Sequence, residues 1–381
     1  MGARTRGIAN QILSGGLDAT DGLSGVVPSS NITNASVTSV SSTPSIGGGF
    51  DKVASDPPSP TEGDIWYNTT SNTVKGYLFV SDAWSSGGNL NTARSSHFGA
   101  GTQTAALVAS GSPLNTNNSP APTSGSTTEE GDGSTWTSGG TVPEERNNGG
   151  GAGTQTAAIK ISGFFPGPAG GNPPTVQTYD GSTWSTTTGV PTGHGRGVGL
   201  GTQTAAFYVG GEIPGSPNDT NRVEEWNGSS WTAAPTINLG RMFLGGGGTT
   251  TASLIVGGYK ENPPDPEVNN VEEYNGTSWS NVNVYPVAQR SMSGSGSQTA
   301  QHTWGGYDGT ANVAITNTYD GTSWTASANL ATARQSSNCG GYSTPNAASI
   351  AAGGSDASPA ITSSTENFTQ GGVGVKTLTS S

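Results

Sequence analysis

Six of the nine arginines recur at nearly even spacing along the 381-residue chain: Arg94, Arg146, Arg196, Arg241, Arg290 and Arg334. A guanidinium presents planar N–H groups that match carboxylates and phosphates. A ring of such groups would grip an anionic glycan or a carboxylate. Alternatively, each arginine bonds loop carbonyls or pairs with a glutamate of the same repeat, such as Glu130, Glu225, Glu273 or Glu366. One copy per repeat favours this structural role.

Four stretches of unequal length and composition predict variable loops: residues 112–127, 164–174, 212–221 and 259–270. Recognition is commonly placed on variable loops of a rigid scaffold. We expect aromatic and acidic side chains there to stack on and hydrogen-bond to a sugar. The candidate ligand-binding residues are Phe164, Phe165, Glu212, Tyr259, Glu261, Asp265 and Glu267. The alternative is that these loops pack against neighbouring subunits.

The sequence offers little support for catalysis. His97, His194 and His302 fall in different repeats, and no Cys/His spacing is typical of zinc. The single Cys339 excludes an internal disulfide and is expected to be a buried small hydrophobe. We therefore predict no catalytic residue, no metal and no cofactor.

The side chains above must be positioned by a repeat whose motif is an aromatic residue, Asn-Gly or Asp-Gly, two hydroxyl residues and Trp. It occupies residues 179–184, 226–231, 274–279 and 319–324. Asn-Gly and Asp-Gly predict type I′ hairpin turns, which need positive φ at both central residues. The tryptophans are expected to pack between neighbouring units, and they recur every 45 to 52 residues: Trp84, Trp136, Trp184, Trp231, Trp279 and Trp324.

A Thr-Gln-Thr-Ala-Ala cassette and a Gly-Gly stop keep the same phase, as at residues 202–206 and 210–211. Each unit then reads as four short strands, exemplified by residues 195–200, 204–209, 222–226 and 230–232. A period of about 45–50 residues with four strands is typical of a β-propeller blade. The predicted fold is all-β: a six-bladed β-propeller with four-stranded blades over residues 85–370.

Ring closure has two possible sources, because the last unit lacks its outer hairpin. Trp84 lies in the phase of the repeat, which favours residues 61–84 as a β-hairpin followed by the ring-closing strand. Alternatively, residues 373–379 of the carboxy-terminal segment 371–381 supply that strand. Residues 1–60 are rich in Ser, Thr and Gly and end in the Pro-rich stretch 56–60. They predict an extended amino-terminal segment.

The chain carries a formal charge of −12, which disfavours binding to nucleic acid or to an anionic membrane. Gly and Pro are abundant, at 61 and 23 residues, yet nine tryptophans argue against general disorder. The amino terminus lacks the apolar core of a signal peptide, and no stretch is long enough to span a bilayer. We expect assembly in a cytoplasm without membrane insertion.

The arginine after each hairpin, the Gly-Gly stop and the Trp resemble the kelch repeat of β-propellers. The cassette and the short hairpin are similar to those of kelch-like virion proteins of marine tailed phages, including phages of cyanobacteria. Residues 5–10 and 63–68 resemble segments that open phage fibre and tail-structure proteins. The resemblance implies a virion structural protein: a tail fibre, a baseplate or collar component, or a capsid-surface protein.

What this resemblance implies is a non-enzymatic role. Residues 1–60 would dock to other virion proteins, and a homo-oligomer would display the propeller to a host surface glycan or receptor, or use it as a spacer. The alternative function is a propeller glycosidase or sialidase-like depolymerase acting on host polysaccharide. Residues 180–184 look similar to the sialidase box, but they lack its spacer between Asp and Gly.

Overall fold

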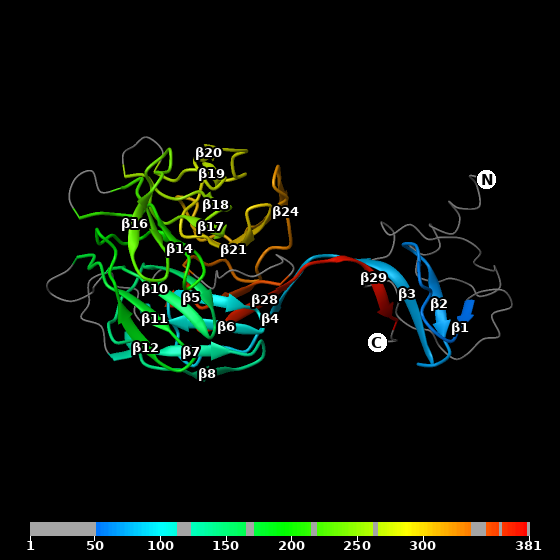
Figure 1. Cartoon of the computed structure of the whole chain (residues 1–381). Helices are drawn as coiled ribbons and strands as arrows, with labels where there is room; N and C mark the ends of the chain where they lie inside the picture. Colours follow the sequence, from blue (N-terminus) through cyan, green and yellow to red (C-terminus); the bar gives the residue numbers. More distant parts are fainter. Residues whose placement is uncertain are drawn as a thin grey trace. The chain divides into compact units, whose positions relative to one another are not determined.

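The computed structural model describes residues 51–112, 123–164, 171–214, 219–261, 266–336, 348–357 and 360–378. The chain divides into unit 1, residues 1–82 and 371–381, and unit 2, residues 83–370 (Figure 1). Predictions for residues 1–50, Phe165, Asp265 and Cys339 fall outside the described ranges. Within those ranges, no helix has the length and apolar character needed to cross a membrane.

Unit 2 contains five antiparallel sheets whose four strands follow one another in sequence. They are β5 (Phe98–Thr102), β6 (Ala105–Ala109), β7 (Thr128–Gly131) and β8 (Trp136–Ser138); β9 (Gly150–Thr154), β10 (Ala157–Ile161), β11 (Val176–Tyr179) and β12 (Trp184–Thr187); β13 (Val198–Gly201), β14 (Ala206–Val209), β15 (Val223–Trp226) and β16 (Trp231–Ala234); β17 (Gly245–Gly248), β18 (Ser253–Val256), β19 (Val271–Tyr274) and β20 (Trp279–Asn281); and β21 (Ser293–Ser297), β22 (Ala300–Trp304), β23 (Thr316–Tyr319) and β24 (Trp324–Ala326). These sheets are five blades of a β-propeller, and the predicted fold class is confirmed.

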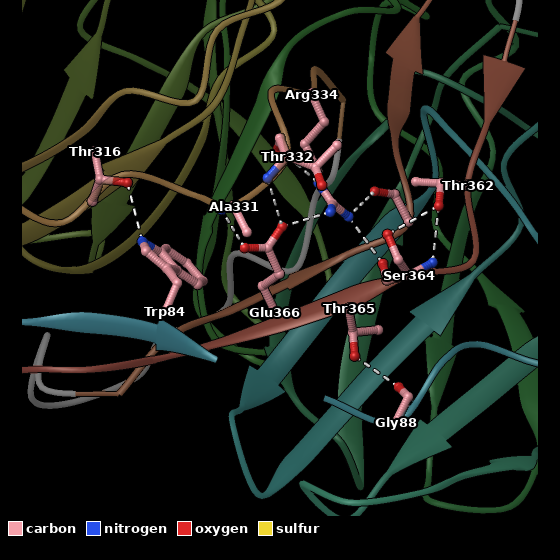
Figure 2. Close-up of polar contacts among 11 residues, drawn as sticks. Trp84, Gly88, Thr316, Ala331, Thr332, Arg334, Thr362, Ser364, Thr365 and Glu366 are labelled. Carbon is pink, nitrogen blue, oxygen red and sulfur yellow. Dashed lines mark hydrogen bonds and ion pairs between the residues drawn. The ribbon is translucent and has the colours of Figure 1, made fainter. Parts of the chain in front are cut away.

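The sixth blade combines strands from both ends of unit 2. β25 (Ile350–Ala352) pairs with β28 (Thr365–Thr369), and β28 pairs with β4 (Ala83–Ser86); a hairpin of β26 (Ser355–Ala357) and β27 (Ala360–Ile361) lies alongside in sequence. Trp84 Nε1 donates to Thr316 Oγ1 of the fifth blade at 3.1 Å, and Thr365 Oγ1 donates to the Gly88 carbonyl at 2.7 Å (Figure 2). The amino-terminal strand therefore closes the ring, as the phase of Trp84 favoured.

Unit 1 is one four-stranded sheet in the order β1 (Asp51–Val53), β2 (Ile65–Asn68), β3 (Thr73–Val80) and β29 (Gly372–Thr377). The alternative closing strand thus pairs with β3 of unit 1. Asp56 accepts hydrogen bonds from Trp66 Nε1, Asn68 Nδ2 and Lys75 Nζ at 3.1, 2.8 and 2.8 Å. The Pro-rich stretch therefore begins with a residue anchored in this sheet. In connectivity, unit 2 is an insertion between β3 and β29.

The hydrophobic core of unit 2 lies between blades, because each of its six clusters combines residues of two successive blades. One cluster joins Ile159 of the second blade to Tyr208 and Trp231 of the third. Another joins Phe98 of the first blade to Trp184 of the second, with ring centroids 5.9 Å apart. Every repeat tryptophan lies in one of these interfaces. Large aromatic side chains let narrow sheets bury enough apolar area to adhere.

The cassette glutamines connect the blades through the main chain. Gln155 Nε2 donates to the carbonyls of Ala106 and Gly131 in the preceding blade, at 3.0 and 2.9 Å. Gln103, Gln203 and Gln298 make the same double contact with their preceding blades. The cassette glutamine thus has a structural role, because each amide donates to two main-chain carbonyls of the preceding blade.

The Asp-Gly and Asn-Gly turns differ from the predicted type I′ hairpin. Tyr179 pairs with Trp184, so the loop has four residues, and only Gly181 has positive φ, at 94°. Asp180 Oδ1 accepts the main-chain N–H groups of Ser182 and Thr183 at 2.9 and 2.7 Å. These bonds hold the pKa of the Asp180 carboxyl well below its usual range. The Asp180 side chain therefore favours a four-residue loop over the two-residue loop of a type I′ hairpin, an effect that the dipeptide pattern does not include.

Glycine lets the innermost strands approach one another closely. A Cβ built on Gly199 in β13 would lie 2.3 Å from the main-chain nitrogen of Gly151 in β9. Real Cβ atoms do not come that close, so the backbones of these neighbouring blades contact each other directly. Part of the unusual glycine content therefore reflects packing around the axis of the ring.

We predict that Gln155→Ala lowers the free energy of unfolding by about 1–3 kcal/mol, because two interblade carbonyls lose their donor. Urea unfolding of the full chain, followed by tryptophan fluorescence, measures this change. Thr250→Ala is the matched control, since Thr250 fills the same cassette position of the fourth blade with a shorter side chain. Equal effects of the two substitutions would contradict the role given to the glutamine.

Candidate functional site

A closed ring of main-chain hydrogen bonds forms where the connections between blades meet. Its members are one residue per blade, all with left-handed φ between 52° and 61°: Ser96, Asn148, Arg196, Phe243, Ser291 and Ser336. Each N–H donates to the carbonyl of the member before it, and Ser96 donates to Ser336, over 2.6–3.3 Å. We call the surface made by these connections and by the loops between second and third strands the loop face. The ring is its centre.

The residue two places before each ring member is buried and polar: Arg94, Arg146, His194, Arg241, Gln289 and Arg334. The expectation of six equivalent arginines therefore needs correction. Arg196 is itself a ring member, and Arg290 directly precedes one. Counting back seven residues from the glycine of each first-to-second strand turn, such as Gly201 and Gly296, would have identified His194 and Gln289.

Three of these buried residues are arginines that form an ion pair with a glutamate on the third strand of their own blade. Arg94 pairs with Glu129, Arg241 with Glu272, and Arg334 with Glu366, over 2.5–2.6 Å. Glu366 also accepts the N–H groups of Ala331 and Thr332 at 2.6 and 3.3 Å (Figure 2). Two main-chain donors and a guanidinium satisfy the buried carboxylate, which makes its burial tolerable. These arginines have the structural role.

Glu366 was expected as a partner, but Glu130, Glu225 and Glu273 lie one residue away from the strand position that faces the buried arginine. Successive side chains of a strand point to opposite faces, so a one-residue shift sends them elsewhere. Glu130 accepts a hydrogen bond from the Tyr179 hydroxyl of the next blade, and Glu273 accepts one from Tyr319 at 2.9 Å. These glutamates serve the interfaces between blades.

The second blade lacks the third-strand glutamate and has two basic residues, Arg146 and Lys160, at this place. Gln177 stands in the glutamate position, and Lys160 Nζ donates to Gln177 Oε1 at 3.2 Å and to the Glu144 carbonyl at 3.3 Å. Arg146 pairs with the partly exposed carboxylate of Glu144 at 2.6 Å. Burial, and secondarily the charge of Arg146, lowers the pKa of Lys160 to about 7.

The two arginines outside the buried positions reach the loop face. The Arg196 side chain is 30% exposed, pairs with Glu212, and lies 5.0 Å from the ring centroid of Phe243. The Arg290 side chain is 29% exposed and pairs with Glu267 Oε1 at 2.9 Å. Its guanidinium carbon lies 4.8 Å from the ring centroids of both Tyr259 and Tyr307. We call Arg290, Tyr259, Tyr307 and Glu267 the arginine clamp.

Each loop between second and third strands begins at an equivalent position beside the central ring. Isolated bridges tie these positions to the residues that precede the ring members; the positions are Ser112, Phe164, Glu212, Tyr259, Tyr307 and Ser355. The structure thus places three of the predicted ligand-binding residues, Phe164, Glu212 and Tyr259, at equivalent positions of successive blades, and a bridge joins Glu267 to Tyr259. Glu261 is exposed two residues beyond Tyr259.

Sequence reasoning missed Phe243 and Tyr307. Tyr307 follows Gly305-Gly306 just as Tyr259 follows Gly257-Gly258. The position after each Gly-Gly pair would therefore have identified Tyr307 as a candidate binding residue. Both side chains are partly exposed. At these loop-start positions the second to fifth blades carry an aromatic or charged residue, whereas the first and sixth blades carry Ser112 and Ser355. The described residues contain no group of three His, Cys, Asp or Glu side chains placed to hold a metal ion.

The lowered pKa of Lys160 predicts a pH dependence of stability. Between about pH 7 and 10.5 the unfolded chain holds one more proton than the folded chain, so the free energy of unfolding rises with pH there. Lys160→Met removes this titration. We expect the variant to be more stable than the native chain near pH 7, and the difference to shrink as the pH approaches 10.

Urea unfolding of both proteins at several pH values between about 6 and 10 measures the difference. Lys376→Met is the control, because Lys376 is exposed and its removal should leave the pH profile unchanged. A Lys160→Met difference that stays constant over the whole range would show that the buried amine does not titrate there.

Comparisons with known proteins support the architecture. No protein-family model matches the sequence, and no curated protein matches it. Among solved structures, "Structure of YjhT" is similar with a TM-score of 0.60 and 13% sequence identity, over 75% of this chain and 99% of that one. YjhT is a β-propeller. At this identity the likeness shows the fold alone, and the chain shares with YjhT a propeller architecture.

Proposed function

We propose that this protein is a non-enzymatic structural component of a phage particle whose propeller binds carbohydrate on the loop face. One observation carries the proposal: Arg290 is fixed between Tyr259 and Tyr307 while 29% of its side chain stays exposed. By contrast, the arginines that pair with a glutamate of their own blade, Arg94, Arg241 and Arg334, are buried. A rigid, partly exposed guanidinium between aromatic rings is suited to recognition.

The chemistry of the loop face matches a sugar. Aromatic side chains offer flat apolar surfaces for the C–H face of a pyranose, while guanidinium and carboxylate groups supply directional donors and acceptors for its hydroxyls. Phe164, Phe243, Tyr259 and Tyr307 are all partly exposed, and Arg196 and Arg290 lie among them in sequence. A host glycan is therefore the proposed ligand.

The two carboxylates that pair with the partly exposed arginines favour binding over hydrolysis. A retaining or inverting glycosidase needs one carboxyl to act as an acid and another to act as a nucleophile or base. Glu212 and Glu267 each bond an arginine, so neither carboxylate is placed as a proton donor. This arrangement supports a recognition module over the depolymerase alternative.

The proposed virion setting is supported by the phage-like segments at residues 5–10 and 63–68 and by the surface of unit 1. Of the four exposed large hydrophobic side chains in the described residues, three lie on β3 and β29: Phe79, Val373 and Val375. Phe79 and Val373 are direct register partners. An apolar surface of this kind supports contact with other particle proteins or with further copies of the chain. The propeller would then be displayed by unit 1 and residues 1–60.

Binding of the full chain to host lipopolysaccharide or capsular polysaccharide tests the carbohydrate part. We expect Tyr259→Ala and Tyr307→Ala to weaken binding about tenfold each, because each removes one side of the clamp. Phe79→Ala, an exposed aromatic of unit 1, should bind like the native chain. No binding by the native chain would refute the proposal, and release of reducing ends would replace it with the depolymerase.

Deletion of residues 1–60 tests the docking part. We expect phage particles assembled with the shortened protein to lack it, because the deletion removes both the proposed docking segment and β1 of unit 1. Immunoblotting of purified particles measures incorporation. Val284→Ala at full length is a control for altered exposed apolar surface outside unit 1 and should leave incorporation unchanged. Normal incorporation of the shortened protein would refute docking through this segment.

A further inference from the structure

We infer that the ligand of the loop face is an acidic saccharide, and that the arginine clamp binds the carboxylate of a sugar acid. This inference rests on the proposed carbohydrate-binding function and specifies its ligand class. The geometry of Arg290, the relative exposure of the paired charges and the aromatic surroundings each support it.

The geometry of Arg290 restricts how a ligand can approach. Tyr259 and Tyr307 lie 4.8 Å from its guanidinium carbon, and Nη1 is engaged by Glu267 Oε1 at 2.9 Å. A guanidinium has five N–H donors in one plane, so the donors left over point outward from its edge. A carboxylate accepts such donors through two coplanar oxygens and forms charge-assisted hydrogen bonds, which are stronger than those to a sugar hydroxyl.

The exposure of the paired charges places the cation toward the ligand. The Arg290 side chain is 29% exposed, whereas that of its partner Glu267 is only 8% exposed. An incoming group therefore meets the guanidinium before the carboxylate, although the chain as a whole carries a charge of −12. Glu267 fixes the orientation of the guanidinium from the less exposed side, and is a positioning residue.

Arg196 and Glu212 of the third blade repeat this arrangement in simpler form. Arg196 is 30% exposed, its partner Glu212 is 23% exposed, and Phe243 covers the guanidinium at 5.0 Å. Two such arginines, on the third and fifth blades, suit a polymer whose acidic groups recur along the chain. The partly exposed tyrosines beside Arg290 add apolar surface that a sugar ring can cover and that a simple anion cannot use.

The test uses the full chain, D-glucuronate as the probe, and the side-chain Nε–H signals of arginine in a ¹H–¹⁵N spectrum. Arg290→Lys identifies the signal of Arg290 by its loss. We expect glucuronate to shift this signal saturably. Glucose, the methyl ester of glucuronic acid and acetate should each shift it much less at equal concentration. Tyr307→Ala should weaken the glucuronate response about tenfold, while Phe79→Ala should not change it.

The possible outcomes separate the ligand class from the function. Equal shifts from glucuronate and its methyl ester, or from glucuronate and glucose, would overturn the acidic class while leaving carbohydrate binding intact. Equal shifts from acetate and glucuronate would show an anion site without recognition of the sugar. No shift from any probe would overturn the inference, and the polysaccharide-binding experiment then decides whether the proposed function falls with it.

Discussion

In four of the six blades a cassette glutamine donates to two main-chain carbonyls of the preceding blade, and unit 2 depends on such contacts between neighbouring blades. Gln103 makes them across the closure, from the first blade to Ser349 and Phe368 of the sixth. The tryptophan of each blade packs against the same preceding neighbour. A chain with only 30% hydrophobic residues can therefore fold, because each blade obtains from its neighbour the apolar area and hydrogen bonds that its own sheet lacks.

This construction separates residues that stabilise the propeller from residues available for binding. The central ring fixes six main-chain positions. The polar side chains two residues before them are buried, where they form ion pairs or hydrogen bonds within the blade. The side chains of the ring members, and that of Arg290 directly before one of them, are less buried. In the third to fifth blades these residues include Arg196, Phe243 and Arg290. Side chains placed on rigid elements keep their geometry, and the binding role proposed for the arginine clamp depends on this.

The periodic tryptophans and turn residues were sufficient to predict the blades, their number and the strand that completes the sixth. The candidate site was less predictable. Arg196 and Arg290 stand one or two residues from the buried position, and spacing alone could not distinguish them from Arg94. The glutamate partners were displaced by one residue because strand register decides which face a side chain takes. The predicted turn type was wrong because the Asp180 side chain accepts hydrogen bonds from the main chain, a local contact that the dipeptide pattern does not reveal.

The insertion of unit 2 between β3 and β29 also bears on how the ring forms. Phe79 pairs with Val373 in unit 1 and Trp84 pairs with Phe368 in unit 2, so the two ladders keep one register although the whole propeller separates their strands in sequence. Joining distant ends costs loop-closure entropy. Whichever ladder forms first bears that cost and raises the effective concentration of the other pair of strands. While the sheet of unit 1 is intact, the two chain segments that lead into unit 2 are held together, so reclosure of an opened ring costs less loop-closure entropy.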